Sequence, residues 1–362
     1  MSHALPSPAA ARHPRRQQTY RPGGGLLLAV ALLISAVLSG CGGGGESGGT
    51  PAGGSAATDG KLVIAMLPKL KNIAYFDACH RGARAAADEL GVELIYDGPD
   101  SNSGSEQSRY METWIRQGVS AICVAPNQPR AIRRLVERAS QAGIPVFTWD
   151  TDALESGRQL MVAQVDDKVL GETLVDDLAA QMGGEGKWAI AIASLDAANL
   201  NSWRLHAENR AKTKYPGMTL VDTVVTNEDE NRARELVGTL LGRHPDLGGI
   251  IAFDSNSVPG AADAIERAEK VGEVALTGNS LPNTMRPFIK RGVLQSFYLW
   301  DPRALGELSI RVAVASLRGE KIEPGTELEG YGPLTFSEEN PTTIILSKPV
   351  RFTKDNIDDY DF

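Results

Sequence analysis

The chain has 362 residues, of which 45 are acidic and 37 are basic, so its formal net charge is −8. At about 100–200 residues a domain this length predicts two domains, and a composition of 42% apolar and 23% charged residues excludes wholesale disorder. The negative charge argues against a nucleic-acid partner, and three cysteines are too few for a disulfide scaffold.

The amino terminus has the pattern of an export signal. Residues 1–40 contain four arginines and no acid, and residues 26–38 form an apolar run. A run of about 13 residues is too short for a stable membrane span but is typical of a signal-peptide core. It ends in Leu38-Ser39-Gly40-Cys41, which resembles the bacterial lipobox. We expect 1–40 to be a lipoprotein signal peptide and Cys41 to be lipidated; the alternative is a buried apolar segment with a chance cysteine.

A glycine-rich stretch follows the cysteine. Residues 42–58 contain no large apolar side chain and cannot pack a core, which is typical of a flexible tether. We therefore expect a tether over 41–60 and a globular body beyond it. Such a protein is exported and is lipid-anchored to the outer face of the cytoplasmic membrane or lies in the periplasm.

The body alternates short apolar strands with helices. Glycine closes several of the early helices and a β-branched residue opens the next strand, as at Gly91-Val92. This rhythm predicts a parallel sheet flanked by helices. The strands are expected at 61–67, 92–96, 121–125 and 144–149, and the helices at 77–90, 105–117 and 130–142.

A second set of elements follows a break near 160–165 and predicts a second parallel sheet. Its helices are expected at 167–182, 202–214, 228–243, 259–270 and 283–291, and its strands at 187–193, 219–225, 249–253 and 274–278. The last elements are a strand at 294–299, a helix at 302–317 and short strands near 343–346. We expect these to return to the first sheet and then to the second.

The expected fold class is therefore α/β, with two doubly wound parallel-sheet lobes joined by a hinge that the chain crosses several times. The N-terminal lobe is expected to contain 61–164 plus 300–330, and the C-terminal lobe 165–299 plus 331–362.

Open parallel sheets bind ligands at the carboxyl ends of their strands. The residues there are rich in carboxylates and amides, which pair with hydroxyl groups, and in aromatic rings, which can cover the face of a sugar. The alternative is that the polar residues cap helices and the tryptophans belong to the core. The candidate ligand-binding residues are Lys69, Tyr75, Phe76, Asp150, Asp152, Asn199, Asn201, Trp203, Asp254, Ser255, Asn279 and Trp300.

Signals for catalysis or metal binding are weak. The histidines of the body have no metal-ligand spacing, and Gly278-Asn279-Ser280 lacks the second glycine of a nucleophile elbow. We expect no enzyme activity, no cofactor and no metal site; a hydrolase using Ser280 is the alternative. Cys79 and Cys123 are expected to be buried thiols rather than a disulfide.

Several short segments of the body carry a family resemblance. They are Pro68-Lys69, Tyr96–Pro99, Thr148–Asp152, Ala197–Asn201 with Trp203, Pro282-Asn283, Met285–Pro287, Leu299–Asp301, and the ending Lys354–Asp358 with Tyr360–Phe362. Through them, residues 61–362 resemble the periplasmic binding proteins of the ribose-binding type, the sugar-capturing subunits of ABC importers. Within that group the segments look most like the branch of the autoinducer-2 receptor and the rhamnose-binding proteins.

The resemblance implies a periplasmic-binding-protein type I fold and particular site residues. Lys69 and Asp150 match ligand-contacting positions of the autoinducer-2 receptor. Four further contact positions of that receptor differ and read Asn199, Leu200, Phe253 and Ser255 in this chain. Phe253 thereby joins the candidate ligand-binding residues.

The function implied is that of a substrate-binding lipoprotein, a monomer that captures a small sugar between its lobes and delivers it to ABC permease subunits. The expected sugar is a rhamnose-like deoxyhexose or a pentose. The alternative is an autoinducer-2 binding protein for quorum-signal uptake or sensing.

Overall fold

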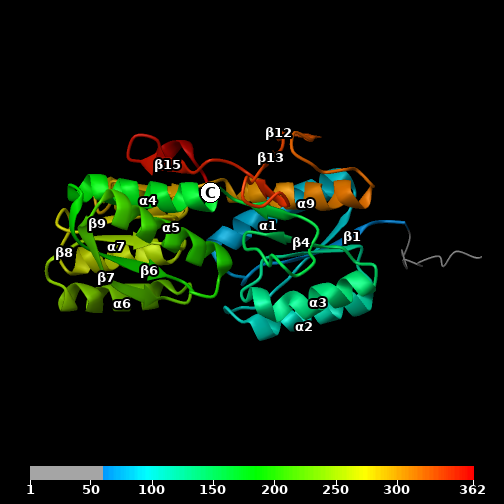
Figure 1. The fold of residues 1–362 in the computed structure, drawn as a ribbon, viewed down its shortest axis with the longest axis horizontal. Coiled ribbons are helices and arrows are strands. Elements are labelled where there is room, and N and C mark those ends of the chain that lie inside the picture. The colour runs from blue at the N-terminus through cyan, green and yellow to red at the C-terminus, as the bar shows by residue number, and fades with distance from the viewer. Residues whose placement is uncertain (1–59) are drawn as a thin grey trace, which may run out of the picture. The chain divides into compact units, whose positions relative to one another are not determined.

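The computed structural model describes residues 60–362 (Figure 1). The predicted signal peptide, the lipidation of Cys41 and all but the last residue of the predicted tether lie outside the described residues.

The first sheet has seven strands in the order β13-β14-β5-β4-β3-β1-β2. Every pair is parallel except β13 and β14. The strands β3 and β4 are buried at every position, as expected where helices cover both faces of a sheet. The strands are β1 (Val63–Leu67), β2 (Glu93–Tyr96), β3 (Ala121–Val124), β4 (Val146–Trp149), β5 (Met161–Ala163), β13 (Thr335–Phe336) and β14 (Thr343–Ile345).

Two pairs of helices cover this sheet. Figure 1 shows the pair α1 and α9 on one side of the strands and the pair α2 and α3 on the other. The first pair crosses closely, because a Cβ atom on Gly306 would lie 1.9 Å from the backbone oxygen of Cys79. Only glycine fits at such a crossing. The helices are α1 (Ala74–Leu90), α2 (Gly104–Gln117), α3 (Pro129–Gln141) and α9 (Pro302–Leu317).

The second sheet has four parallel strands in the order β7-β6-β8-β9. Next to it, β10 pairs with β15 in antiparallel fashion, and a parallel bridge from Asn279 to Tyr298 joins β10 to the end of β9. The strands are β6 (Glu185–Ile192), β7 (Gly217–Val225), β8 (Leu247–Ala252), β9 (Ala275–Gly278), β10 (Ser296–Leu299) and β15 (Val350–Thr353).

Five helices surround the second sheet. The helix α4 packs on α5 and against β8 and β9, while α7 packs on α6 and α8. Figure 1 shows α4 and α6 on opposite sides of the strands. The helices are α4 (Asp167–Met182), α5 (Ala198–Lys214), α6 (Glu230–Arg243), α7 (Ser257–Arg267) and α8 (Pro282–Arg291). The remaining elements are β11 (Glu327–Leu328), β12 (Gly332–Pro333) and a 3-10 turn at Ile357–Asp359.

The predicted fold class is confirmed, but one assignment of the chain to a lobe is wrong in part. We expected residues 331–362 in the C-terminal lobe; β13 and β14 instead complete the first sheet, whereas β15 pairs with β10 of the second lobe as expected. The error arose at β5, a three-residue strand that we had treated as a break between the lobes. The free edge of β5 pairs in parallel with Thr343–Ile345, and this pairing places β14 in the first sheet. The chain therefore crosses between the lobes after β5, after β10 and after β14.

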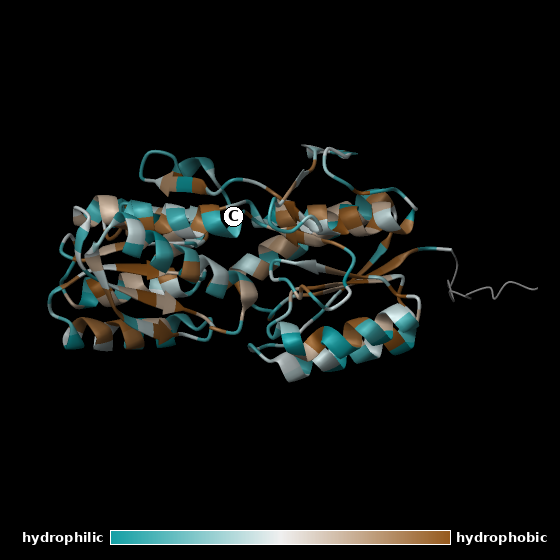
Figure 2. Cartoon of the chain, viewed as in Figure 1, coloured by the Kyte–Doolittle hydropathy of each residue, from teal (hydrophilic) through white to brown (hydrophobic). Residues whose placement is uncertain are grey.

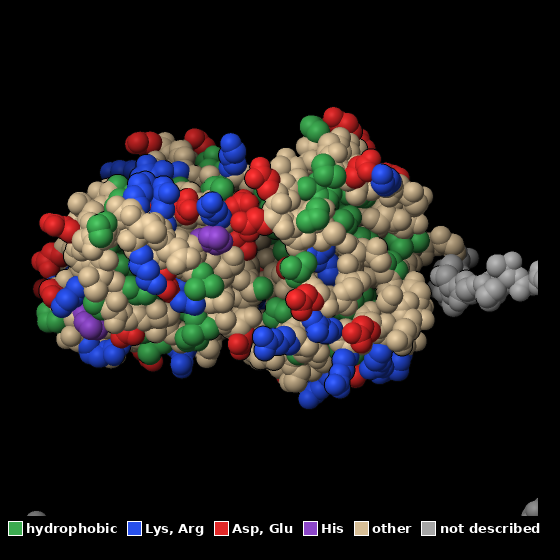
Figure 3. Space-filling view, in the orientation of Figure 1, with side chains coloured by type: hydrophobic (Ala, Val, Ile, Leu, Met, Phe, Trp, Pro, Cys, Tyr) green, Lys and Arg blue, Asp and Glu red, His purple; other side chains and the backbone are tan. Residues whose placement is uncertain are grey.

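The hydrophobic residues are distributed differently over the strands and the helices. In Figure 2 the strands are mostly hydrophobic, whereas the helices alternate hydrophobic and hydrophilic residues. No helix within 60–362 is long and apolar enough to cross a membrane. Lys and Arg side chains gather over α2 and α3 (Figure 3), where the exposed arginines are Arg109, Arg116, Arg130, Arg133, Arg134 and Arg138.

Candidate functional site

A cavity lies between residues that follow the strands of both sheets. Eleven of the thirteen candidate residues line it: Lys69, Tyr75, Phe76, Asp150, Asn199, Trp203, Phe253, Asp254, Ser255, Asn279 and Trp300. They come from segments up to about 230 residues apart, and they meet because parallel strands end at the same edge of each sheet. Three further lining residues were not among the candidates, namely Ile73, Leu200 and Glu228.

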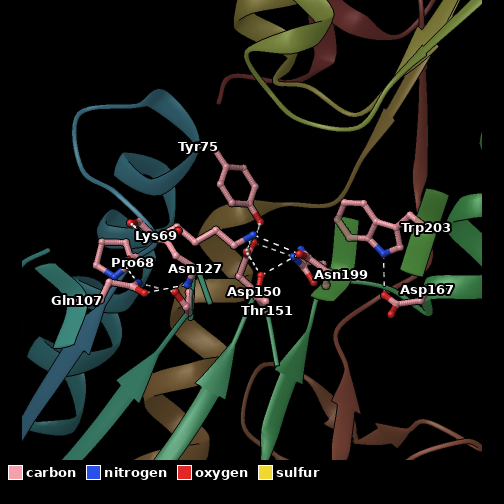
Figure 4. A network of polar contacts seen from close by, with 12 residues as sticks. Pro68, Lys69, Tyr75, Gln107, Asn127, Asp150, Thr151, Asp167, Asn199 and Trp203 are labelled. Carbon is pink, nitrogen blue, oxygen red and sulfur yellow. Dashed lines mark hydrogen bonds and ion pairs between the residues drawn. The ribbon is translucent and has the colours of Figure 1, made fainter. Parts of the chain in front are cut away.

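Asp150 is the centre of a buried polar network (Figure 4). Its Oδ1 lies 2.8 Å from Lys69 Nζ, and the two side chains are each 4% exposed. Its Oδ2 accepts hydrogen bonds from Tyr75 Oη at 2.9 Å and from Gln164 Nε2 at 2.7 Å. A buried carboxylate is stable only when it is paired and hydrogen-bonded, and Asp150 meets both conditions. Burial, followed by the charge of Asp150, raises the pKa of Tyr75 well above its usual value, so this tyrosine remains a donor.

The network also joins the two lobes. Asn199 lies in α5 of the second lobe, and its Oδ1 accepts from Lys69 Nζ at 3.3 Å and from Thr151 Oγ1 at 2.9 Å. With these contacts made, the cavity has a volume of about 30 Å³. A single water needs roughly 10–15 Å³ by this measure, so the space is smaller than a sugar ring.

Aromatic rings form the apolar part of the lining. The ring centroids of Trp300 lie 5.8 Å from those of Trp203 and 6.1 Å from those of Tyr75. Both indole N–H groups are used within the protein: Trp300 Nε1 donates to Tyr75 Oη at 3.0 Å, and Trp203 Nε1 donates to Asp167 Oδ1 at 2.7 Å. The rings are thus held in fixed orientations, which suits contact with the apolar face of a sugar.

Trp149 illustrates the alternative that we weighed for the tryptophans. It is fully buried and packs edge-on against Phe76 at 5.7 Å, but it does not line the cavity. It is a core residue, and it fixes the ring of Phe76, which does line the cavity.

Asp254 lines the cavity and also binds the backbone at the start of α7. Its Oδ1 accepts from the backbone N–H groups of Asn256 and Ser257, at 3.2 and 2.8 Å, and its Oδ2 accepts from the hydroxyls of Thr226 and Ser257. Burial raises the pKa of Asp254, and the hydrogen bonds from Ser257 oppose this. Its oxygens are therefore occupied at the start of α7, as the helix-capping alternative predicts.

Two candidates lie outside the cavity, contrary to expectation. Asp152 Oδ2 pairs with Arg158 at 2.6 Å, and its Oδ1 accepts from Thr148 Oγ1 at 2.6 Å. Asn201 Oδ1 accepts from Arg204 Nη2 at 2.8 Å. In both cases an arginine close in the sequence binds the side chain within its own lobe.

Glu228 is the most informative of the residues that we missed. It follows β7, so the rule of reading the residues just past each strand could have found it. We instead assigned it to a helix expected to begin at 228, whereas Asp229 caps α6 and Glu228 precedes it. Burial raises the pKa of Glu228 to about 7.

A second set of buried contacts holds the backbone beneath Lys69. Gln107 Nε2 donates to the backbone oxygens of Pro68 and Ala125 at 2.9 and 2.8 Å, and Gln107 Oε1 accepts from the N–H of Asn127 at 2.8 Å. The amide of Asn127 then donates to the backbone oxygen of Lys69 at 2.8 Å. Figure 4 shows these contacts, which lead from Gln107 of α2 to the backbone of Lys69.

The family of the chain is decided by comparison with known proteins. Residues 64–321, well over half of the chain, match the family model described as periplasmic binding protein domain. The chain is a periplasmic binding protein.

Three relatives indicate to which type of periplasmic binding protein this chain is similar. It is 25% identical over 269 residues to the ribose import binding protein of Salmonella typhimurium, covering 74% of this chain and 89% of that protein. Its fold is similar to that of LsrB from Clostridium saccharobutylicum in complex with AI-2, with a TM-score of 0.77, 26% identity, and coverage of 83% of this chain and 100% of that chain. It is also similar to a sugar ABC transporter protein from Actinomyces odontolyticus, with a TM-score of 0.67, 33% identity, and coverage of 83% and 98%.

These relatives confirm the predicted resemblance and the type I fold. The periplasmic binding protein described here is a sugar ABC transporter substrate-binding protein of the ribose-binding type. Its homologues are substrate-binding proteins that partner with permeases and act in the periplasm.

Among the described residues of this periplasmic binding protein, Ser280 and the two cysteines are buried. Ser280 is fully buried and its Oγ donates to the backbone oxygen of Ser255 at 2.7 Å, which does not suit a nucleophile. Cys79 and Cys123 are buried free thiols, as predicted, and burial raises the pKa of Cys123 to about 12. Within residues 60–362, no group of three or more His, Cys, Asp or Glu side chains is placed to hold a metal ion.

Proposed function

We propose that this protein captures one small neutral sugar in the cavity between its lobes and delivers it to a membrane permease. The observation that supports this is the arrangement around Asp150: a buried ion pair with Lys69, enclosed by aromatic rings and contacted by Asn199 from the opposite lobe. Polar groups held between aromatic rings are the chemistry that recognises a polyol with an apolar ring face.

A rhamnose-like deoxyhexose or a pentose is the sugar that we favour. The two charged positions shared with the autoinducer-2 receptor, Lys69 and Asp150, would bind hydroxyl groups, while Asn199 would bind the ligand from the second lobe. A sugar would then take over the bonds that Lys69 and Thr151 now make to Asn199.

Autoinducer-2 is the second candidate. Lys69 and Asp150 are retained at matching positions, and the similar LsrB structure is a complex with AI-2. The furanosyl diol would meet a different second-lobe surface, because Asn199, Leu200, Phe253 and Ser255 replace the other contacts.

We also propose that the protein is a lipoprotein. Residues 1–40 would be removed on export, Cys41 would carry the lipid, and 41–60 would be the tether. In this proposal Cys41→Ala moves the protein from the membrane fraction of the native bacterium to the soluble fraction. An unchanged membrane fraction would contradict it.

A thermal-shift panel tests the function. Residues 42–362 are heated with L-rhamnose, D-ribose, D-arabinose and autoinducer-2. A ligand that binds only the folded protein adds about 2.7 kcal/mol to the unfolding free energy at a hundredfold excess over Kd. A rise with one sugar supports the sugar proposal, a rise with autoinducer-2 alone supports the second candidate, and no rise with any compound contradicts both.

A further inference from the structure

Two hydrogen-bond acceptors in the cavity have no donor among the described residues. They are Glu228 Oε2 and Asn279 Oδ1, and both atoms are buried. The other two carboxyl groups of the cavity differ, because Asp150 and Asp254 each accept several hydrogen bonds from the protein. Glu228 is therefore the one of these three carboxyl groups with an oxygen to which no described residue donates a hydrogen bond.

The backbone places Glu228 in the cavity by an uncommon conformation. Asn227 and Glu228 both have positive φ, 60° and 58°, a left-handed conformation that costs energy for residues with a side chain. Asn256 Nδ2 stabilises this loop by donating to the backbone oxygen of Glu228 at 2.7 Å, and the N–H of Asn227 donates to the backbone oxygen of Ala193 at 3.0 Å. Such strain is found most often at functional sites, and Asp150, with a φ of 60°, shares it.

The charges around Glu228 define the ligand that it can accept. Lys69 faces it from just past β1, Asp150 from just past β4 and Asp254 from just past β8, and Asp229 and Glu230 follow it in the chain. Three carboxyl groups thus share the cavity with the single ammonium of Lys69, which Asp150 already pairs. A ligand carrying a carboxylate or phosphate would add a further negative charge in a buried site.

We propose that Glu228 determines specificity: its Oε2 accepts a hydrogen bond from a ligand hydroxyl, and it excludes sugars that carry a carboxylate or a phosphate. The inference rests on the proposed function and deepens it, since it names the residue that restricts the site to neutral sugars. Because an ionised carboxylate is the stronger acceptor, the affinity for such a sugar falls as Glu228 takes up a proton. With the pKa of Glu228 near 7, this loss is expected between pH 8 and pH 5.5.

The experiment compares the wild type, Glu228→Gln and the control Glu235→Gln, an exposed position on α6. Calorimetry at pH 8 and pH 5.5 uses D-ribose, L-rhamnose and D-galactose as neutral probes. D-ribose 5-phosphate and D-galacturonate are the anionic counterparts. We expect the wild type to bind at least one neutral probe and to lose about tenfold in affinity at the lower pH.

Glu228→Gln keeps the shape of the side chain and removes its charge. We expect it to bind the neutral probe about tenfold more weakly at pH 8, with no further loss at pH 5.5, and to discriminate about tenfold less against the anionic counterpart. Glu235→Gln should behave as the wild type. These effects support the inference, because a merely structural role would not move the pH profile.

Three results overturn it, and the last is distinguishable from the first two. Sugar binding by the wild type that is independent of pH, or the same pH profile and the same discrimination in Glu228→Gln, overturns the inference and leaves the proposed function intact. Failure of the wild type to bind any neutral probe overturns the proposed function, and the inference with it. The wild-type pH profile decides the matter even if Glu228→Gln does not fold.

Discussion

The two sides of the cavity are built differently. On the first-lobe side, Asp150 receives donors from three separate segments, through Lys69, Tyr75 and Gln164. On the second-lobe side, Glu228 Oε2 and Asn279 Oδ1 have no donor within the described residues. One side is a completed network that stabilises the fold, whereas the other keeps acceptors free.

The difference shows how a binding protein can be both stable and selective. A buried charge costs free energy unless its partners are in place before the ligand arrives, and the first-lobe side meets that requirement. Unpaired acceptors also cost free energy, and a ligand hydroxyl that satisfies them gains affinity in return. Mutations on the two sides should therefore separate stability from binding.

The largest expected effect is on the first-lobe side. Asp150→Ala leaves the ammonium of Lys69 buried without its partner, and we expect the unfolding free energy to fall by about 3–5 kcal/mol. Urea denaturation measures this. The matched control is Asp246→Ala, which breaks the exposed pair with Lys187 and should leave the unfolding free energy nearly unchanged.

The double variant Lys69→Met/Asp150→Ala tests whether the unpaired ammonium causes this loss of stability. Removing both charges should restore much of the stability, because no unpaired charge remains buried. If Asp150→Ala were as stable as the Asp246→Ala control, the first-lobe network would not have the role that we assign to it.

An intermediate effect on stability is expected at Asp167, a carboxylate of the second lobe that accepts a hydrogen bond from Trp203. Burial raises the pKa of Asp167 to about 6, and the indole N–H of Trp203 opposes the shift. Because the folded state holds this proton more tightly than the unfolded state, stability should decrease as the pH rises from about 4 to about 6.

Asp167→Asn removes this titration and keeps an oxygen for Trp203 Nε1. At pH 7.5 the variant should be more stable than the wild type, by about 1–3 kcal/mol. Its stability between pH 4 and pH 6 should change less than that of the wild type, measured by urea denaturation at each pH. A variant less stable than the wild type at pH 7.5 would contradict the prediction.

The smallest effect on stability is expected on the second-lobe side. Asn279→Ala removes an acceptor that has no donor, so the unfolding free energy should change by less than about 1 kcal/mol. Sugar affinity in the panel should nevertheless fall by about tenfold. If this variant were as destabilised as Asp150→Ala, the two sides would not differ in the way that we describe.

Local signals were sufficient to predict most of the fold. The helices 167–182 and 302–317 were predicted with the bounds that the structure has. Each starts at an aspartate whose side chain accepts from the first turn, Asp166 and Asp301, and α4 ends at Gly183 in the left-handed conformation. These signals lie within a few residues of the helix ends, and reading them requires no knowledge of distant contacts.

Pairing between distant segments was harder to predict. The strand β5 has three residues and was taken as a break, and β14 pairs with it although about 180 residues separate the two. A strand this short has little pattern of its own, so its partner decides whether it forms. The misplaced lobe boundary at residue 331 follows from this.

Local signals and distant contacts also contributed differently to the prediction of the site. The sequence by itself determined which residues stand at the strand ends, because parallel topology brings the carboxyl ends of strands together, and eleven of thirteen candidates line the cavity. Only the tertiary structure decided which polar atoms near the strand ends are free. Arg158 binds Asp152 and the start of α7 occupies Asp254, whereas Glu228 keeps an acceptor unpaired. The reason is physical: strand position depends on local patterning, but a hydrogen-bond partner depends on side chains that meet only when the chain has folded.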